Sequence, residues 1–399
     1  MSTASDSSAP VLVVGGGIGG MAAALALSQS GFAVELFEQS PEIGEIGAGL
    51  QLGPNGFAAM DALGVGERAR RRAVYTDELV MMDAIDGSEI ARVPVGEAFR
   101  SRFHNPYAVI HRADIHRSLY EEVELVPRIR VYTSARIAGV DVEPDGARLV
   151  DAAGAIYEGA AVVGCDGVHS VVRQRMIGDG HRVSGHVVYR AVVPRADMPA
   201  DLCWNAAAIW VGPNCHLVHY PLRGGEQYNI VVTFHSRQQE EWGVREGTRE
   251  EVMSYFTTIC DRPRQLLDRP TSWKRWSTAD RDPVERWGQG RATLLGDAAH
   301  PMLQYLAQGA CIALEDAVTL REALRASDGE LEPAFRLYES RRIVRGARLT
   351  LSAREMGRIY HAKGVERLVR NSLWVGRTPE RFYDALEWLY GWTVEKCLA

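Results

Sequence analysis

The chain has 399 residues, of which 46% are hydrophobic and 24% are charged. This length and composition predict an ordinary soluble protein of two or three domains with a sizeable core. The formal net charge of −6 and the isoelectric point near 6.0 argue against a nucleic-acid-binding protein, which would normally be basic.

The first residues and the cysteines indicate a cytoplasmic protein without a membrane span. The opening MSTASDSSAP is a polar tail, expected to be frayed, and glycines interrupt the apolar run that begins at Val11. Signal peptides and membrane spans do not have this pattern. The six cysteines lack Cys-x-x-Cys spacing, so we expect them to be reduced and mostly buried.

An apolar βαβ unit is predicted near the N-terminus. Its strand, turn, helix and second strand fall at residues 11–14, 15–20, 21–30 and 33–37, and Glu38 follows. Two later strands, at 160–164 and 292–295, run into Asp166-Gly167 and Gly296-Asp297. Their continuous apolar character is typical of strands buried on both faces.

A second pattern, rich in β-branched and aromatic residues, occupies the middle of the chain. It predicts strands at 187–193, 208–211, 214–222 and 228–234. The turn Arg223-Gly224-Gly225-Glu226 joins the last two strands as a hairpin, so we expect an antiparallel sheet inserted within the first domain. Helices are expected from Gly309 onward, at about 309–326 and 333–356.

The turn GGGIGG predicts a bound dinucleotide. It places Gly15, Gly17 and Gly20 in a G-x-G-x-x-G pattern between a strand and a helix, with Ile18 and Gly19 inside it. Glycines let the backbone turn tightly and approach a pyrophosphate, and the helix N-terminus then offers amides to the phosphates. Glu38, at the end of the next strand, would accept hydrogen bonds from a ribose diol.

Two further stretches separate a flavin protein from a dehydrogenase. VVGCDGVHSVVR at 162–173 and LLGDAAHP at 294–301 each place an aspartate after a buried strand, where open α/β sheets bind ligands. Either alone is compatible with an ordinary turn. All three motifs in this order resemble the single-component flavoprotein aromatic hydroxylases with the 4-hydroxybenzoate hydroxylase fold, over residues 10 to 380.

This resemblance implies an α/β fold, with a Rossmann-like FAD-binding βαβ domain, an inserted antiparallel β-sheet substrate domain and C-terminal helices. The FAD-binding domain is expected at 10–75, 100–180 and 280–350, the substrate domain at 76–99 and 181–279, and the helical region at 351–399. No second G-x-G-x-x-G follows a strand, so a separate nicotinamide domain is not expected. NADH would then bind transiently, and a homodimer is the family expectation.

The resemblance also assigns cofactor roles. The ADP half of FAD would lie on Gly15, Gly17, Ile18, Gly19, Gly20 and Glu38. Arg112 would lie near the phosphates and ribityl chain, Asp166 on the pyrophosphate side and in NAD(P)H use, and Asp297 on the ribityl hydroxyls. The segment 47–55, with Gln51, would wrap the flavin, and the amides of Gly309 and Ala310 would face its N1/O2 edge.

One position departs from the family pattern. The family usually has Gly-Gln-Gly before the helix that faces the flavin, whereas this chain has Ala307-Gln308-Gly309. The helix N-terminus still supplies amide groups, but the substitution puts the geometry of the loop in question.

The implied chemistry is hydride transfer from NAD(P)H to FAD, followed by reaction with O2 to a flavin C4a-hydroperoxide. That species would transfer hydroxyl to an electron-rich ring, which becomes more nucleophilic when a phenol loses its proton. The protein must then supply a base at the phenol oxygen, a dry environment and an anchor for a carboxylate.

The stretch NCHLVHYPL at 214–222 offers a base. Strand alternation places His216, Val218 and Tyr220 on one face and Cys215, Leu217 and His219 on the other. The two histidines therefore cannot chelate one metal, and we predict no metal site. His216 and Tyr220 would lie roughly 13 Å apart, at about 3.3 Å per residue, which is enough to flank a single ring.

More closely, GPNCHLVHYPLRGG and HPMLQYLAQGA resemble family members that hydroxylate 3-hydroxybenzoate para to its hydroxyl and form gentisate. Carried over, His216 is the base or the hydrogen-bond partner of the substrate hydroxyl, Gln304 assists at the same oxygen, and Tyr107 and Tyr220 position the ring and carboxylate. Each of these residues has a structural alternative: a satisfied core histidine, a loop hydrogen bond or aromatic packing. His300 is expected to be structural.

Other activities remain open at this point. Hydroxylases that remove the carboxylate, acting on salicylate at C1 or on 6-hydroxynicotinate at C3, share the fold. A flavin halogenase fits less well because W-x-W-x-I-P is absent. A flavin-binding protein without hydroxylase activity is the alternative from another class.

Overall fold

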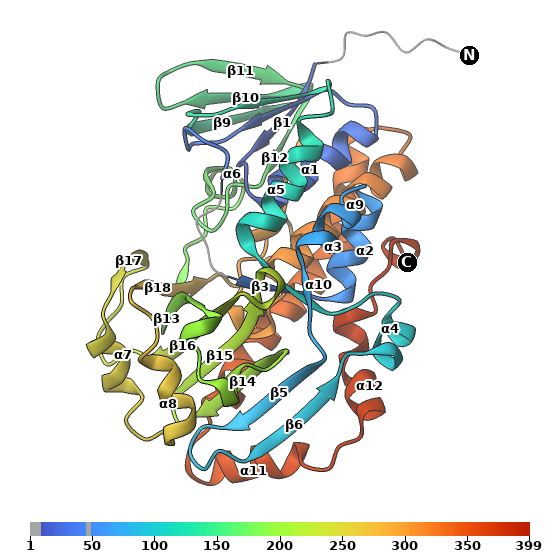
Figure 1. Cartoon of the computed structure of the whole chain (residues 1–399). Coiled ribbons are helices and arrows are strands. Elements are labelled where there is room, and N and C mark those ends of the chain that lie inside the picture. Colours follow the sequence, from blue (N-terminus) through green and yellow to red (C-terminus); the bar gives the residue numbers. More distant parts are fainter. Residues whose placement is uncertain (1–8, 45–48) are drawn as a thin grey trace.

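The computed structural model describes residues 9–44 and 49–399. The expected frayed tail at residues 1–8, and residues 47 and 48 of the segment predicted to wrap the flavin, lie outside the described residues. The mixed α/β architecture confirms the predicted fold class, and Figure 1 shows two main layers of strands with helices around them.

A five-stranded parallel sheet occupies the upper part of Figure 1. Its order is β19 (Ala292–Leu294), β12 (Ala161–Gly164), β1 (Val11–Val14), β2 (Val34–Phe37) and β8 (Ile129–Tyr132). Every residue of β1, β12 and β19 is buried, as expected for apolar strands covered on both faces. The strands predicted from the apolar runs are confirmed to within a residue at each end.

Helices and a small sheet cover the parallel sheet. These elements are α1 (Ile18–Gln29), α2 (Pro54–Ala62), α3 (Gly66–Arg72), α5 (Arg112–Val123), α6 (Val171–Met176), β9 (Ile137–Glu143), β10 (Gly146–Asp151) and β11 (Ile156–Gly159). Helix α1 begins at Ile18, inside the predicted turn, because the turn is completed at Gly15, whose φ is 103°. Gly31, with φ 95°, follows the end of the helix as predicted.

An eight-stranded sheet forms the lower layer (Figure 1). Its order is β17 (Gly243–Gly247), β18 (Trp273–Asp280), β13 (Arg182–Pro194), β16 (Gln227–His235), β15 (Cys215–Leu222), β14 (Ala206–Gly212), β5 (Glu78–Asp83) and β6 (Glu89–Pro94). The predicted antiparallel arrangement holds from β17 to β14, but β14 and β5 run parallel. The β5–β6 hairpin comes from an earlier part of the chain. Because no tight turn connects β5 to β14, these two strands are not constrained to run antiparallel.

Strand β15 separates two apolar clusters. Cys215 and Leu217 belong to the cluster that includes Trp210 and is covered by α7 (Arg249–Tyr255) and α8 (Asp261–Leu267). Val218 and Tyr220 belong to the cluster on the other face. The predicted alternation of side chains along this strand is confirmed.

A three-stranded sheet, β3 (Gly49–Leu52), β7 (Ala108–His111) and β4 (Val74–Tyr75), lies beside the β15 end of the lower layer. The remaining helices are α4 (Glu97–Phe103), α9 (Gly309–Ala326), α10 (Leu331–Tyr360), α11 (Gly364–Trp374) and α12 (Pro379–Tyr390). Helix α9 has the predicted bounds, and α10 is longer than predicted because it continues to the edge of β15, where the amide of Asn214 donates to the carbonyl of His361. Among residues 9–44 and 49–399, no helix is long and apolar enough to cross a membrane.

Candidate active site

The G-x-G-x-x-G turn packs so closely that side chains are excluded from it. A Cβ on Gly15 would lie 2.4 Å from the carbonyl oxygen of Cys165, and one on Gly20 would lie 1.8 Å from the carbonyl oxygen of Gly15. Gly17 is the N-cap residue of α1, and no side chain caps this helix. The N-terminal amides of α1, with Ile18 and Gly19 in the first turn, therefore lie beside backbone that a ligand can approach closely.

Glu38 lies next to this turn, as predicted. Its carboxylate accepts hydrogen bonds from the amides of Gly16 and Ser40, both at 2.8 Å. These bonds fix the carboxylate at the carboxyl end of β2, where a nucleotide ribose would meet it.

Asp166 has a structural task that the sequence did not indicate. Its carboxylate accepts from the Ser170 hydroxyl at 2.5 Å and from the amides of Val171 and Val172 at 2.7 and 3.2 Å, and so holds the start of α6. Burial raises the pKa of this carboxyl. Its predicted role at the pyrophosphate stays a prediction, although its backbone does lie against Gly15.

Asp297 and the start of α9 form an open polar edge. Asp297 is exposed between buried neighbours, and its carboxylate makes no hydrogen bond within the described part of the chain. A Cβ on Gly309 would lie 3.9 Å from its Oδ1. Gly309 and Ala310 open α9, which has no side-chain cap, so unpaired amides and an unpaired carboxylate lie side by side.

These features fit FAD. The glycine turn excludes side chains where a pyrophosphate would lie, Glu38 and Asp297 offer acceptors to ribose and ribityl hydroxyls, and α9 directs amides at an electron-rich edge. The donors and acceptors therefore match the pyrophosphate, the ribose and ribityl hydroxyls, and one edge of the flavin.

Ala307, the position that departs from the family pattern, has a left-handed backbone. Its φ of 53° and ψ of 36° are left-handed, a conformation that glycine adopts without cost and that costs alanine about 1 kcal/mol. Next to it, the Gln308 side chain accepts a hydrogen bond from Asn55 at 2.8 Å. The alanine therefore adds backbone strain that a glycine at this position would not have.

A buried charged network holds the loop that carries Asp297. Asp316, on α9, accepts from the amide of Gly296 at 3.1 Å and contacts His300 at 2.5 Å. Arg342 binds the other oxygen of Asp316 at 2.6 Å. Burial alone would raise the pKa of Asp316, but His300 and Arg342 lower it to about 2. His300 is therefore a loop anchor, in line with the structural role expected for it.

Gln51, Tyr107 and Arg112 come from the region of the β3–β7–β4 sheet and from helix α5, which follows β7. The Tyr107 hydroxyl donates to the side-chain oxygen of Gln51, which lies on β3. Arg112 is half-buried and opens α5 directly after β7. The structure thus brings two of the predicted cofactor residues and one predicted substrate residue onto adjoining elements.

His216 lies buried on β15, and its Nδ1 lies 2.7 Å from Nε2 of His361. Burial, with smaller contributions from His186 and His235, lowers the pKa of His216 to about 3. The imidazole is therefore neutral at neutral pH, and Nε2 makes no hydrogen bond to any described residue. A neutral imidazole with one nitrogen held and the other free can accept a proton.

Gln304 reaches the same part of the sheet. Its side-chain amide donates to the Thr233 hydroxyl at 3.4 Å, and Thr233 pairs with His216 across β15 and β16. The structure therefore brings Gln304 and His216 together, as the sequence predicted.

Tyr220 lies at the other end of β15, in one apolar cluster with Tyr107. Strand β3 passes directly over it, since a Cβ on Gly49 would lie 2.5 Å from its ring. Burial raises the pKa of both tyrosines, so both keep their protons and can donate hydrogen bonds.

Arg190 and His361 lie in the site but were not predicted from the sequence as site residues. Arg190, on β13, lies near Tyr220 and over the ring of Trp276 at 5.7 Å, and it forms no ion pair with any described residue. Burial lowers its pKa. An arginine inside the apolar run VVYRAVV was the available signal. No sequence pattern pointed to His361, because it is distant in sequence from His216 and lies just after a helix.

Comparisons with known proteins agree with this geometry. A family described as an FAD binding domain matches residues 8–348. The chain is 65% identical over 390 residues to a 3-hydroxybenzoate 6-hydroxylase of Polaromonas naphthalenivorans (strain CJ2), covering 98% of each chain. It is 60% identical over 387 residues to one of Klebsiella oxytoca, covering 97% of this chain and 98% of the other.

A solved salicylate hydroxylase substrate complex has a TM-score of 0.83 at 26% identity, covering 99% of this chain and 98% of that one. The chain therefore belongs to this FAD-binding family. Within the family it is a flavin-dependent aromatic monooxygenase, which confirms the resemblance noted in the sequence.

Proposed function

We propose that the chain hydroxylates 3-hydroxybenzoate para to its hydroxyl and forms gentisate, with FAD as bound cofactor and NADH and O2 as co-substrates. The observation that carries the proposal is the buried His216, held through Nδ1 by His361, on the same strand face as Tyr220. The 65% identical relative named for this activity supports the choice of substrate.

His216 acts as the base at the phenol oxygen. When its Nδ1–H donates to His361, the lone pair on Nε2 accepts the phenol proton, and the imidazolium that forms keeps its hydrogen bond. Loss of that proton raises electron density at the ring carbon para to the oxygen. Gln304, held near His216 through Thr233, donates to the phenolate and stabilises its charge.

The substrate carboxylate lies at the Tyr220 end of the strand. Tyr220 and Tyr107 are protonated phenols that can donate to it and confine the ring. Arg190 provides the positive charge, since a half-buried guanidinium that forms no ion pair with a described residue is stabilised by an anion. The distance along β15 between base and anchor suits a ring that carries both groups.

Bound FAD would supply the acceptor for hydride from NADH and the means of activating O2. Gly15, Gly17, Ile18, Gly19, Gly20 and Glu38 would hold its ADP half. Gln51, Arg112, Asp166, Asp297, Gly309 and Ala310 would hold the pyrophosphate, ribityl and flavin parts. The buried, largely apolar surroundings of His216 and Tyr220 keep bulk water from the reacting ring.

The decisive experiment compares three acids. NADH consumption and product identity are measured with 3-hydroxybenzoate, salicylate and 6-hydroxynicotinate. We expect gentisate from the first and slower NADH consumption with the other two. Catechol from salicylate at a higher rate than gentisate would support decarboxylating hydroxylation instead.

We also propose that the enzyme is a cytoplasmic homodimer. Helix α11 exposes apolar side chains on one face, and these are Val365, Leu368, Val369 and Leu373. A second copy of the chain would remove this surface from water.

A further inference from the structure

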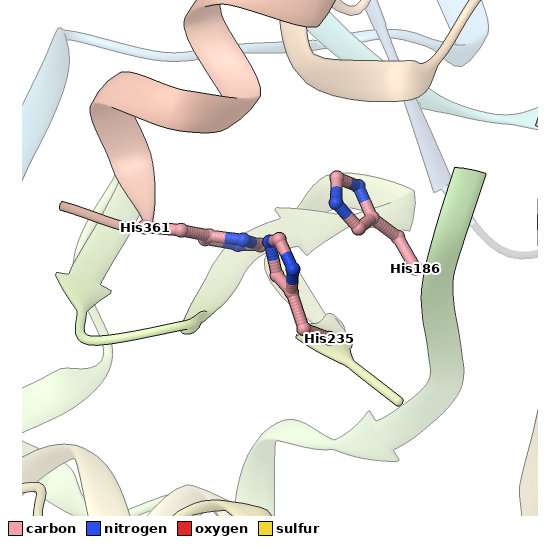
Figure 2. A group of neighbouring side chains, drawn as sticks. All are labelled: His186, His235 and His361. Atoms are coloured by element: carbon pink, nitrogen blue, oxygen red, sulfur yellow. The ribbon is translucent and has the colours of Figure 1, made fainter. Parts of the chain in front are cut away.

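Three histidines outside the predicted catalytic set converge on one point (Figure 2), and one of them, His361, contacts His216. His186 lies on β13, His235 lies on β16, and the two pair in register across these strands. His361 follows α10 and reaches them from the side. One ring nitrogen of each histidine lies within 4.8 Å of those of the other two.

The spacing is close to that of a metal site. Three nitrogens at most 4.8 Å apart can surround a point no more than about 2.8 Å from each of them. Zinc–imidazole bonds are about 2.0–2.1 Å long, so each ring must move by less than about 1 Å. Small rotations about the side-chain bonds achieve this without moving the strands.

The surroundings also favour coordination. The Tyr305 hydroxyl contacts Nδ1 of His186 at 2.5 Å, and Nδ1 of His216 contacts His361 at 2.7 Å. Hydrogen bonds from a second layer of residues orient the imidazoles of metal sites in this way.

His361 has an unsatisfied atom. The residue is 5% exposed, and its Nδ1 is buried without a hydrogen-bond partner in the described part of the chain. Buried ring nitrogens are normally paired, so this imidazole lacks one of the two contacts expected of it. His235, by contrast, is exposed and leaves the group accessible from solvent.

We propose that His186, His235 and His361 bind one divalent transition-metal ion of the Zn²⁺ type. Three imidazoles suit Zn²⁺, Ni²⁺ or Cu²⁺ and not Mg²⁺ or Ca²⁺, which prefer oxygen ligands. A water molecule would occupy the fourth coordination position of the ion, as in zinc sites with three protein ligands.

Metal binding would affect the proposed catalytic base, His216, through its contact with His361. An ion on His361 competes with or polarises its contact to Nδ1 of His216, so the bound form would hydroxylate more slowly. This consequence rests on the proposed function, whereas the metal site itself does not.

Calorimetry with ZnCl2 on the chelator-treated, FAD-loaded full chain tests the site. We expect one Zn²⁺ per chain in the wild type, and roughly tenfold or greater loss of affinity in His235→Ala. The matched control is His104→Asn, because His104 is an exposed histidine far from the cluster in sequence, and asparagine tolerates its left-handed backbone. This control should bind Zn²⁺ as the wild type does.

Failure of the wild type to bind Zn²⁺ at 100-fold excess over protein, or equal affinity in His235→Ala, would overturn the site. Co²⁺ provides a second readout, since nitrogen ligation in a four-coordinate site gives visible absorption bands that His235→Ala should lose. Hydroxylation rates with and without Zn²⁺ test the link to His216 separately. Zn²⁺ binding that leaves the wild-type rate unchanged would refute that link.

Discussion

At the scale of single residues, His216 has one ring nitrogen held by a contact and one that makes no hydrogen bond to a described residue. The contact with His361 at 2.7 Å fixes the ring, and burial keeps it neutral. A general base must combine a free lone pair with a fixed position, and His216 has both.

His216→Ala should slow hydroxylation by about 10²–10⁴-fold, because general-base catalysis contributes that much, while FAD stays bound. Single-turnover product formation and flavin absorbance after gel filtration measure the two effects. His219→Leu is the matched control, since His219 is a buried histidine on the opposite face of the same strand. Flavin loss in His216→Ala would instead mark His216 as a structural residue.

Arg190→Met should raise KM for 3-hydroxybenzoate by roughly 10–100-fold, because it removes the charge proposed to hold the carboxylate. FAD content should not change. Lys274→Met serves as control, since Lys274 pairs with Arg190 across β13 and β18 but is half exposed. An unchanged KM would place the carboxylate elsewhere, and lost FAD would make Arg190 a cofactor residue.

At the scale of elements, sequence patterns were sufficient where the signal is local. The glycine turn, the buried strands and α9 follow from neighbouring residues, and even the alternation along β15 could be predicted. The parallel pairing of β14 with β5, the His216–His361 contact and the isolation of Arg190 could not, because each joins segments remote in sequence. The capping of α6 by Asp166 was hidden because an aspartate after a strand serves a ligand or a helix equally well.

Asp316, on helix α9, stabilises the folded protein to an extent that depends on pH. The pKa of Asp316 is lowered to about 2 in the folded protein, so its contribution to stability is complete above its ordinary value of 3.8 and is lost as the pH falls toward 2. This contribution to the free energy of unfolding is on the order of 2 kcal/mol.

Asp316→Asn should therefore flatten the loss of unfolding free energy between pH 4 and pH 2. It should also cost about 3–5 kcal/mol at pH 7, because it breaks the buried pair with Arg342, which keeps only Glu315 as a carboxylate partner. Urea unfolding across this range measures both. Asp145→Asn, at an exposed acid, is expected to behave as the wild type does. Equal pH slopes in Asp316→Asn and the wild type would contradict this account.

At the scale of the whole molecule, the site is assembled from both sheets and the C-terminal helices. The parallel sheet supplies the glycine turn and the Asp297 loop, and the eight-stranded sheet supplies His216 (Figure 1). Helix α10 ends one residue before His361, which contacts His216. Removal of the C-terminal part would therefore remove His361 and leave the base without its partner.

The exposed face of α11 gives a prediction at the same scale. Leu368 is 60% exposed, and Leu368→Glu should shift a homodimer toward monomer because it places charge in the proposed apolar contact. Light scattering coupled to gel filtration measures the mass, and Glu366→Gln, on the same helix, is the control. A wild-type monomer, or a Leu368→Glu dimer of unchanged stability, would exclude this face as the interface.

The most direct test of the central claim is the product formed from 3-hydroxybenzoate by the FAD-loaded enzyme with NADH and air. We predict one gentisate for each NADH consumed, identified by chromatography against the isomeric dihydroxybenzoates. Formation of 2,3- or 3,4-dihydroxybenzoate, or NADH oxidation that yields no hydroxylated ring, would contradict the account.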